Sequence, residues 1–228
     1  MKLIGERRAL AAVIFAFYTI LYAVLALMAA QPGLEPALYA LAGVYGLAFF
    51  ALVAGYFWAR WYAVGVGIYG VIVGALGIWQ MGAEPIILFM GGTHLAAALL
   101  LWGDSMSSSY DGQTKWRERF HMDENAVHRL GNSIIRAGVS LPIVLLYALA
   151  PRTGALEVAL PAALLTGVGL HALVKLKTWG VFALGAAGGL LLAYAGVTGL
   201  ALVPTLSGAL LLSAVVPFAA PILRYVRA

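Results

Sequence analysis

Residues 6–33 read ERRALAAVIFAFYTILYAVLALMAAQPG, and this stretch decides the fold. A basic pair, Arg7-Arg8, precedes an apolar run without any charge over 9–30, and turn residues follow at 31–33. A helix of about 20 apolar residues crosses the roughly 30 Å hydrocarbon core of a bilayer. The run is too long for a signal-peptide core of about 7–15 residues. It therefore predicts an uncleaved membrane span whose basic end faces the cytoplasm.

The composition of the whole chain agrees with this interpretation. Of the 228 residues, 63% are hydrophobic and 10% are charged, whereas a soluble domain has about 25% charged residues. So much apolar surface indicates lipid as the solvent. The chain has no cysteine, which excludes disulfides, iron–sulfur clusters and thioether-linked haem.

The same apolar pattern recurs along the chain and predicts an all-α bundle of about eight transmembrane helices. Short turns rich in Pro and Gly separate most of the runs. The predicted spans are 9–30, 37–58, 61–81, 85–102, 131–150, 156–175, 178–196 and 201–222. With eight spans both termini are cytoplasmic, and Pro217 and Pro221 are expected to kink the last one.

The basic residues support this segmentation, because thirteen of the fourteen Lys and Arg residues fall on one side of the bilayer. Only Arg152 falls on the other side, with Glu35, Glu84 and Glu157. This bias accounts for the net charge of +5 and predicts contact with anionic lipids rather than with nucleic acid. The predicted location is the inner (plasma) membrane of a bacterium.

One sizeable loop, 103–130, separates a first four-span half (1–102) from a second (131–228). Within it, Trp116, Phe120, Val127 and Leu130 keep roughly helical spacing, which predicts an amphipathic helix at the cytoplasmic interface. The two halves suggest a tandem 4+4 repeat related by an axis along the membrane normal.

Glycines support the repeat hypothesis. At an offset of 118 residues, Trp61 aligns with Trp179 and Gly70 with Gly188. Both spans also carry a small-xxx-small pattern, at Gly70/Gly74 and Gly185/Gly189, which predicts close helix contacts.

Polar side chains at depth are the candidates for function, because such groups are costly in lipid. His94 and His171 lie within the fourth and sixth spans. They are candidate cofactor ligands for haem b as an alternative, although structural hydrogen bonding is the simpler interpretation. Arg136 lies inside the fifth span. It either extends its guanidinium to the headgroups or binds an anionic group, such as a lipid phosphate, with Asn132.

Catalytic and metal sites are not predicted. His121, Glu124 and His128 share a helical face, but the zinc-protease pattern HExxH is absent and a solvated face explains them. The sequence also lacks a nucleophile elbow and a phosphate-binding loop.

Three functions remain. We favour a non-catalytic membrane subunit or scaffold that packs against other membrane proteins or against copies of itself. The alternative is a small permease or channel for a neutral or anionic solute, with Gln80, Thr93, His94 and Arg136 as pocket residues. The second alternative is a membrane enzyme or a haem or quinone redox protein. A polar cavity at mid-depth, lined by both halves, would favour the permease.

Overall fold

The protein is all-helical in the computed structural model, which describes residues 4–29, 32–103, 105–106, 110, 124–150, 156–177 and 179–227. Within these residues each predicted span coincides with a helix, and there is no strand. The eight helices are α1 (Ile4–Leu27), α2 (Glu35–Ala54), α3 (Ala59–Met81), α4 (Pro85–Leu101), α7 (Glu124–Leu149), α8 (Leu156–Val174), α9 (Trp179–Val197) and α10 (Leu202–Arg227). Six are long and apolar enough to cross a membrane, and α4 and the apolar part of α10 (Leu202–Phe218) are shorter.

Proline and glycine set the helix boundaries at the predicted turns. Gly82 has φ of 85°, a conformation that suits glycine, and its N–H closes α3 on the Ile78 carbonyl at 2.9 Å. Glu84 is extended, and Pro85 then begins α4 at the position where a helix needs no N–H donor. At the other end of the bundle Gly55 ends α2 with φ of 72°.

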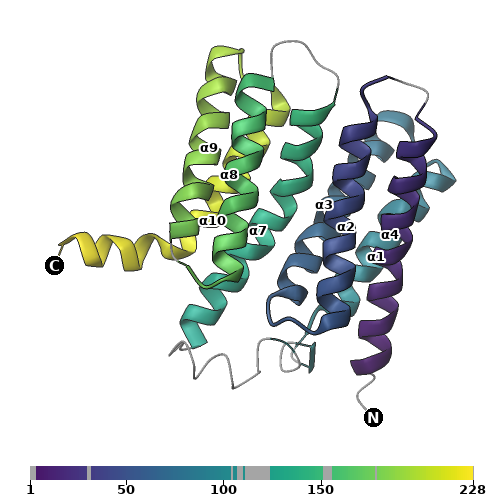
Figure 1. The fold of residues 1–228 in the computed structure, drawn as a ribbon, viewed down its shortest axis with the longest axis horizontal. Helices are drawn as coiled ribbons and strands as arrows, with labels where there is room; N and C mark the ends of the chain where they lie inside the picture. Colours follow the sequence, from purple (N-terminus) through teal and green to yellow (C-terminus); the bar gives the residue numbers. More distant parts are fainter. Residues whose placement is uncertain are drawn as a thin grey trace.

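The helices form two groups of four that stand side by side (Figure 1). In the first group, α1 packs on α2 and α4, and α3 packs on α2 and α4. The second group repeats this ring, since α7 packs on α8 and α10, and α9 packs on α8 and α10. The two rings have the same neighbour order, which agrees with the two predicted halves.

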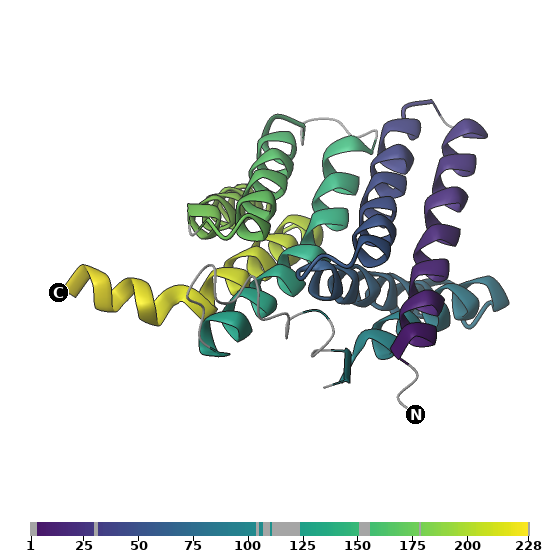
Figure 2. The same ribbon diagram turned by 60° about the horizontal axis from the view of Figure 1, so that its bottom comes forward.

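The halves are not related by the two-fold axis that a symmetric repeat would give. They join through α7, which packs against α3 and α2. A two-fold axis would repeat the contact of α7 with α3 as a contact of α1 with α9. These two helices instead lie at opposite ends of the molecule (Figures 1 and 2). The two halves therefore use different surfaces at their interface, and a common origin for them stays a hypothesis.

A close backbone contact holds the two halves together. A Cβ atom on Gly65 of α3 would lie 3.1 Å from Gly138 Cα of α7 and would overlap the Ile135 carbonyl oxygen. Gly138 in turn lies against Gly65 and the Tyr62 carbonyl. Only residues without a side chain permit helix axes to approach this closely.

Two consecutive arginines in the first turns of α1 bind the ends of its neighbours. Arg7 Nε donates to the Leu100 carbonyl at 2.9 Å and Nη2 to the Trp102 carbonyl at 2.5 Å, at the end of α4. Arg8 Nε donates to the Leu52 carbonyl at 2.8 Å, at the end of α2. The last carbonyls of a helix have no helical donor and carry partial negative charge, so cations there are stabilising.

Tyr110 adds a third donor at the end of α2. Its hydroxyl donates to the Leu52 carbonyl at 3.4 Å, and the Arg8 guanidinium lies 5.6 Å from the centre of its ring. Burial raises the pKa of Tyr110, against a smaller opposing effect of Arg8, so the phenol stays neutral and keeps its proton for this bond.

The predicted glycine contacts are confirmed in the first half and wrong in the second. A Cβ on Gly70 would overlap the His94 ring, and one on Gly74 would lie 2.8 Å from Gly91 Cα. By contrast, a Cβ on Gly185 would meet only Val215, at 3.5 Å, and Gly189 has nothing within 4 Å. In α9 the close contacts are at Gly180, which packs on Gly169 of α8, and at Gly188, which packs on Gly208 of α10. Because α9 is apolar on every side, its sequence does not show which face is buried.

Two predictions fall partly outside the described residues. The loop 103–130 is described at 103, 105–106, 110 and 124–130, so the predicted interfacial helix within it is described only where 124–130 form the first turns of α7. The outer turn that contains Arg152 lies outside the described residues altogether. The last span is one helix to Arg227, and its end leaves the bundle and projects sideways (Figure 1).

The Gly65–Gly138 contact leads to a test of how the halves are joined. We expect Gly65→Ala to destabilise the protein by about 1–3 kcal/mol, because the added methyl group forces the α3 and α7 backbones apart. Thermal unfolding in detergent measures this loss. Gly43→Ala in α2 is the control, since a Cβ there has nothing within 4 Å. Equal melting temperatures for both variants would contradict a tight contact at Gly65.

Candidate functional site

His94 is the only ionisable side chain in α4, and it is buried at the centre of the first half, 2% exposed. Its Nδ1 lies 2.7 Å from the Met90 carbonyl oxygen, and its Nε2 lies 2.6 Å from the Tyr45 hydroxyl. A carbonyl only accepts, so Nδ1 carries a proton, and Nε2 accepts the Tyr45 proton in the neutral ring. Both ring nitrogens are therefore engaged within the protein.

Thr93 forms a second polar chain beside the histidine. Its hydroxyl donates to the Phe89 carbonyl at 2.8 Å and accepts from the Tyr18 hydroxyl at 2.6 Å. The Tyr18 ring also packs on the His94 imidazole, with 4.1 Å between the ring centres. Three helices, α1, α2 and α4, thus contribute to one cluster of aromatic and polar groups.

A small cavity of about 140 Å³ opens next to this cluster. Tyr22, Tyr45, Tyr69 and His94 line it together with glycines and apolar residues of α3 and α4. Gly70 makes this arrangement possible, because a side chain there would occupy the place of the imidazole. All of its lining residues belong to the first half.

A larger cavity of about 310 Å³ lies between the halves, and it is apolar. It is lined by α3, α7 and α10, chiefly by Ile, Leu and Val, and its only polar side-chain atoms are those of Tyr69 and Tyr147. Tyr69 and Val73 also line the cavity beside His94, so α3 alone separates the two spaces. The cavity beside His94 is thus confined to one half, and the cavity that α3, α7 and α10 line at the opposite end of the interface from the Arg60 side chain is apolar.

Arg136 has a structural partner on the neighbouring helix α10. Its Nη1 donates to the Ser213 carbonyl, and the Ser133 hydroxyl donates to the next carbonyl, that of Ala214. Residue 217 would normally donate the helical bond to the Ser213 carbonyl, but it is a proline and has no N–H. Arg136 therefore supplies the donor that Pro217 lacks, which neither of the two sequence interpretations of Arg136 included.

The structure separates the remaining predicted residues. Gln80 is exposed in the last turn of α3 and lines none of the three cavities described in this article. His171 is exposed on α8, which packs on α7 and α9, whereas His94 lies in the other half. This geometry gives no support to a haem held between the two histidines. Asn132 is exposed on α7 and lines a third cavity, with Arg60 and His128 rather than with Arg136.

Sequence reasoning missed the hydrogen-bonding partners of His94 and Thr93. Tyr18 and Tyr22 are four residues apart on one face of α1, and Tyr45 follows in the next helix. That spacing was a signal for an aromatic cluster, but its link to His94 depends on how α1, α2 and α4 are rotated. The link between Arg136 and Pro217 was hidden for the same reason.

No protein-family model matches the chain, and neither a curated protein nor a solved structure matches it significantly. Its function has to be argued from this geometry alone.

A double-mutant cycle tests the role of Arg136. We expect Arg136→Met to lower the melting temperature, because it leaves the Ser213 carbonyl without a donor at a cost of about 1–3 kcal/mol. In a Pro217→Ala background the helix regains its own donor at residue 217, and the same substitution should cost less than half as much. Lys175→Met, at an exposed position, controls for loss of a charge. An equal cost in both backgrounds would contradict this role.

Proposed function

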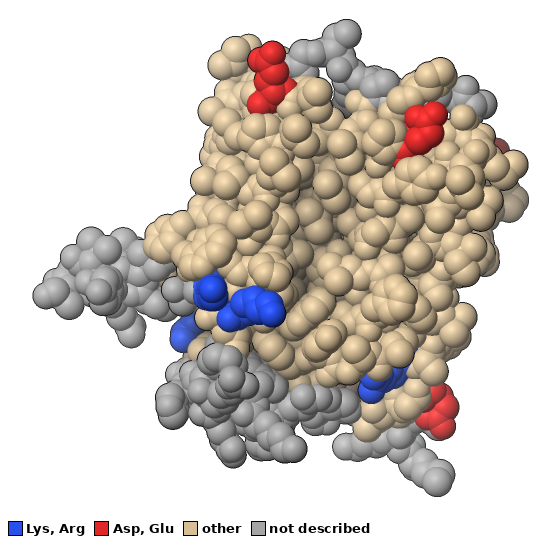
Figure 3. Space-filling model, in the orientation of Figure 1, with Lys and Arg blue, Asp and Glu red and all other residues tan. Residues whose placement is uncertain are grey.

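We propose that the protein spans the membrane eight times, in a bacterial inner membrane, with both termini in the cytoplasm. The described basic residues Arg7, Arg8, Arg60, Lys175 and Lys177 all belong to one end of the bundle, the basic end. The opposite end carries Glu35, Glu84 and Glu157, whereas Glu6 shares the basic end. On the face seen in Figure 3, a broad band between the two ends shows no charged side chain.

The shorter helix α4 fits this topology. The 17 residues of α4 extend about 26 Å at a rise of 1.5 Å per residue, which approaches the hydrocarbon thickness of about 30 Å. Arg7 binds the carbonyls at the end of α4, so this end is anchored at the same level as the start of α1. The asymmetry of charge then orients the basic end towards the cytoplasm.

Within the membrane we propose a non-catalytic subunit or scaffold that packs against another membrane helix. One observation carries this proposal: most polar side chains at depth form hydrogen bonds inside the bundle, and the Ser207 hydroxyl is a buried one without a partner. His94, Thr93, Tyr18, Tyr45 and Arg136 bind one another or backbone carbonyls. A route for a polar solute would need some of these groups on a path between the halves, where the cavity is instead apolar.

The outer face of α9 offers a place for the partner helix. Five residues of α9 form a stripe along this face, at alternating spacings of four and three. All five are exposed: Phe182, Ala186, Gly189, Ala193 and Gly196. Four of the five are Ala or Gly, and the two glycines have nothing within 4 Å. Small residues at this spacing allow another helix backbone to approach closely in lipid. The small-xxx-small pair Gly189/Ala193 of this stripe is thus available on the surface of α9.

The permease alternative retains one supporting observation, the 310 Å³ cavity between the halves. Of the neutral or anionic solute that the sequence suggested, its apolar walls suit a neutral, apolar one.

A pair of glycine variants tests the subunit proposal. In a mild-detergent extract of the native membrane, we expect the wild-type chain to migrate on a native gel as a complex of fixed mass above that of the chain alone. Gly189→Leu should reduce it to the single chain without lowering its melting temperature, because the added side chain meets only the partner.

The control is Gly92→Leu in α4, which is equally exposed and also has open space around it. This variant should keep the complex. A wild-type protein that migrates as a single chain, or a complex that survives Gly189→Leu, would overturn the subunit proposal.

A further inference from the structure

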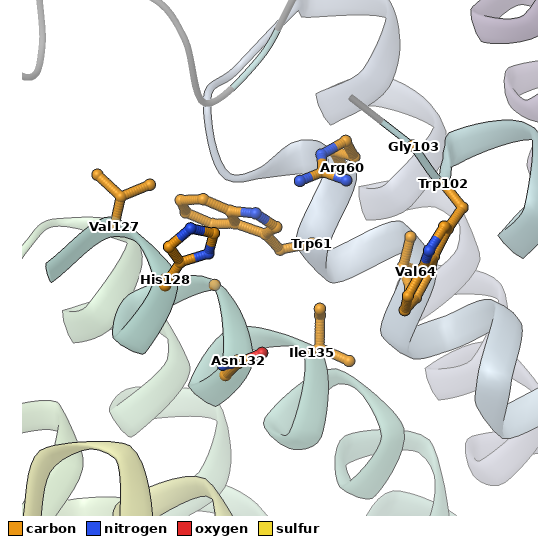
Figure 4. A pocket seen from close by; sticks show the side chains of 10 residues that line it. Arg60, Trp61, Val64, Trp102, Gly103, Val127, His128, Asn132 and Ile135 are labelled. Atoms are coloured by element: carbon orange, nitrogen blue, oxygen red, sulfur yellow. The ribbon is translucent and has the colours of Figure 1, made fainter. Parts of the chain in front are cut away.

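A cavity of about 250 Å³ lies at the basic end, where the two halves meet (Figure 4). Three elements enclose it: the first turns of α3, the residues that end α4, and the first turns of α7. This volume far exceeds the roughly 10–15 Å³ that one buried water needs. Its lining residues are Arg60, Trp61, Val64, Trp102, Gly103, Val127, His128, Gly131, Asn132 and Ile135.

The polar side chains on its wall are all capable of donating hydrogen bonds to an anion. Arg60 comes from α3 in the first half, and His128 and Asn132 come from α7, one helical turn apart. A guanidinium presents several N–H donors in a fixed plane, which suits phosphate oxygens. An amide adds two N–H donors, and a neutral imidazole adds one. None of the described residues on the wall carries a carboxylate.

The position of Arg60 is fixed by the end of α4. Its Nη1 donates to the Leu101 carbonyl at 3.4 Å, which anchors the guanidinium beside the cavity. Figure 4 shows Arg60 on one side of the space and Asn132 on the other. An anion between them would contact both halves at once.

Two tryptophans form amphipathic walls for the cavity. Trp61 is buried, 3% exposed, and Gly131 gives it room, because a Cβ on Gly131 would lie 2.8 Å from the indole. Trp102 ends α4 and is 59% exposed. Tryptophan favours the headgroup level of a bilayer, where one edge of the ring meets polar groups and the face meets apolar chains. Val64 and Ile135 complete the apolar side of the space.

We propose that this cavity binds a phosphate-bearing anion, held by Arg60 with His128 and Asn132. The phosphate comes either from the headgroup of an anionic phospholipid or from a free phosphate compound in the aqueous phase. The sequence placed such a site at Arg136 with Asn132; the structure keeps Asn132 and replaces Arg136 by Arg60 from the other half. The site does not depend on the partner-binding role of α9, which lies in a different part of the bundle.

The test uses delipidated full-length protein in detergent, titrated in native mass spectrometry with phosphatidylglycerol and, separately, with inorganic phosphate. Arg60→Gln should weaken binding of the phosphate-bearing probe about tenfold or more, as expected for loss of charge-assisted hydrogen bonds. Lys177→Gln removes the same charge at the same end but outside the cavity, and should change the affinity less than twofold. Asn132→Leu keeps the charge and the Leu101 bond of Arg60, and should still weaken binding.

The two probes separate the sources of the phosphate. Arg60-dependent binding of phosphatidylglycerol alone indicates a lipid headgroup site, and Arg60-dependent binding of inorganic phosphate indicates a site open to soluble anions. Binding that Arg60→Gln and Asn132→Leu leave unchanged, or equal losses in Arg60→Gln and Lys177→Gln, would overturn the proposal. Absence of binding by both probes would overturn it as well. None of these outcomes depends on whether a partner helix occupies α9.

Discussion

Backbone carbonyls that lack a helical donor must find their partners within this bundle, and the rest of the structure depends on that constraint. In lipid, an unsatisfied carbonyl or hydroxyl costs several kcal/mol because no water replaces the missing bond. The protein meets the constraint with few residues. Arg7 and Arg8 bind the carbonyls that end α4 and α2, and Arg136 binds the carbonyl that Pro217 leaves without a donor. Arg7 and Arg8, which belong to the basic end that we propose to face the cytoplasm, thus also bind the ends of helices.

The packing between the halves follows from a second consequence of the lipid solvent. Apolar side chains gain little by leaving lipid for a protein interior, so close backbone contact carries the association of helices. Gly65 and Gly138 provide that contact between α3 and α7. Such a close crossing leaves space on either side of it. The cavity proposed to bind an anion lies towards the basic end and the apolar cavity towards the opposite end, and both are bounded by α3 and α7.

The sequence predicted the helices well and their rotations poorly. Each helix was predicted from a charge-free apolar run bounded by Pro, Gly or basic residues. Length and composition are enough to predict where a membrane-spanning helix lies in the sequence. The rotation of a helix such as α9 is set by which small residues meet a neighbour, and a helix that is apolar on all sides gives no sign of it. Gly70 and Gly185 were both chosen from the same small-xxx-small spacing; in the structure Gly70 lies against His94, whereas in α9 Gly188 rather than Gly185 meets α10 closely. The Tyr45–His94 pair and the Arg60–Asn132 cavity join distant segments, so they required the fold.

We propose that α4 and its neighbours cross the membrane with the basic end in the cytoplasm, and single-cysteine labelling tests this most directly. The chain has no native cysteine that would react with the probe. Glu84 precedes α4 and Lys177 follows α8, and both side chains are exposed. In intact cells a membrane-impermeant maleimide should label Glu84→Cys but not Lys177→Cys, which should react only after the membrane is opened. Labelling of Lys177→Cys from outside in intact cells would contradict the account, because it would mean that one of the helices up to α8 fails to cross.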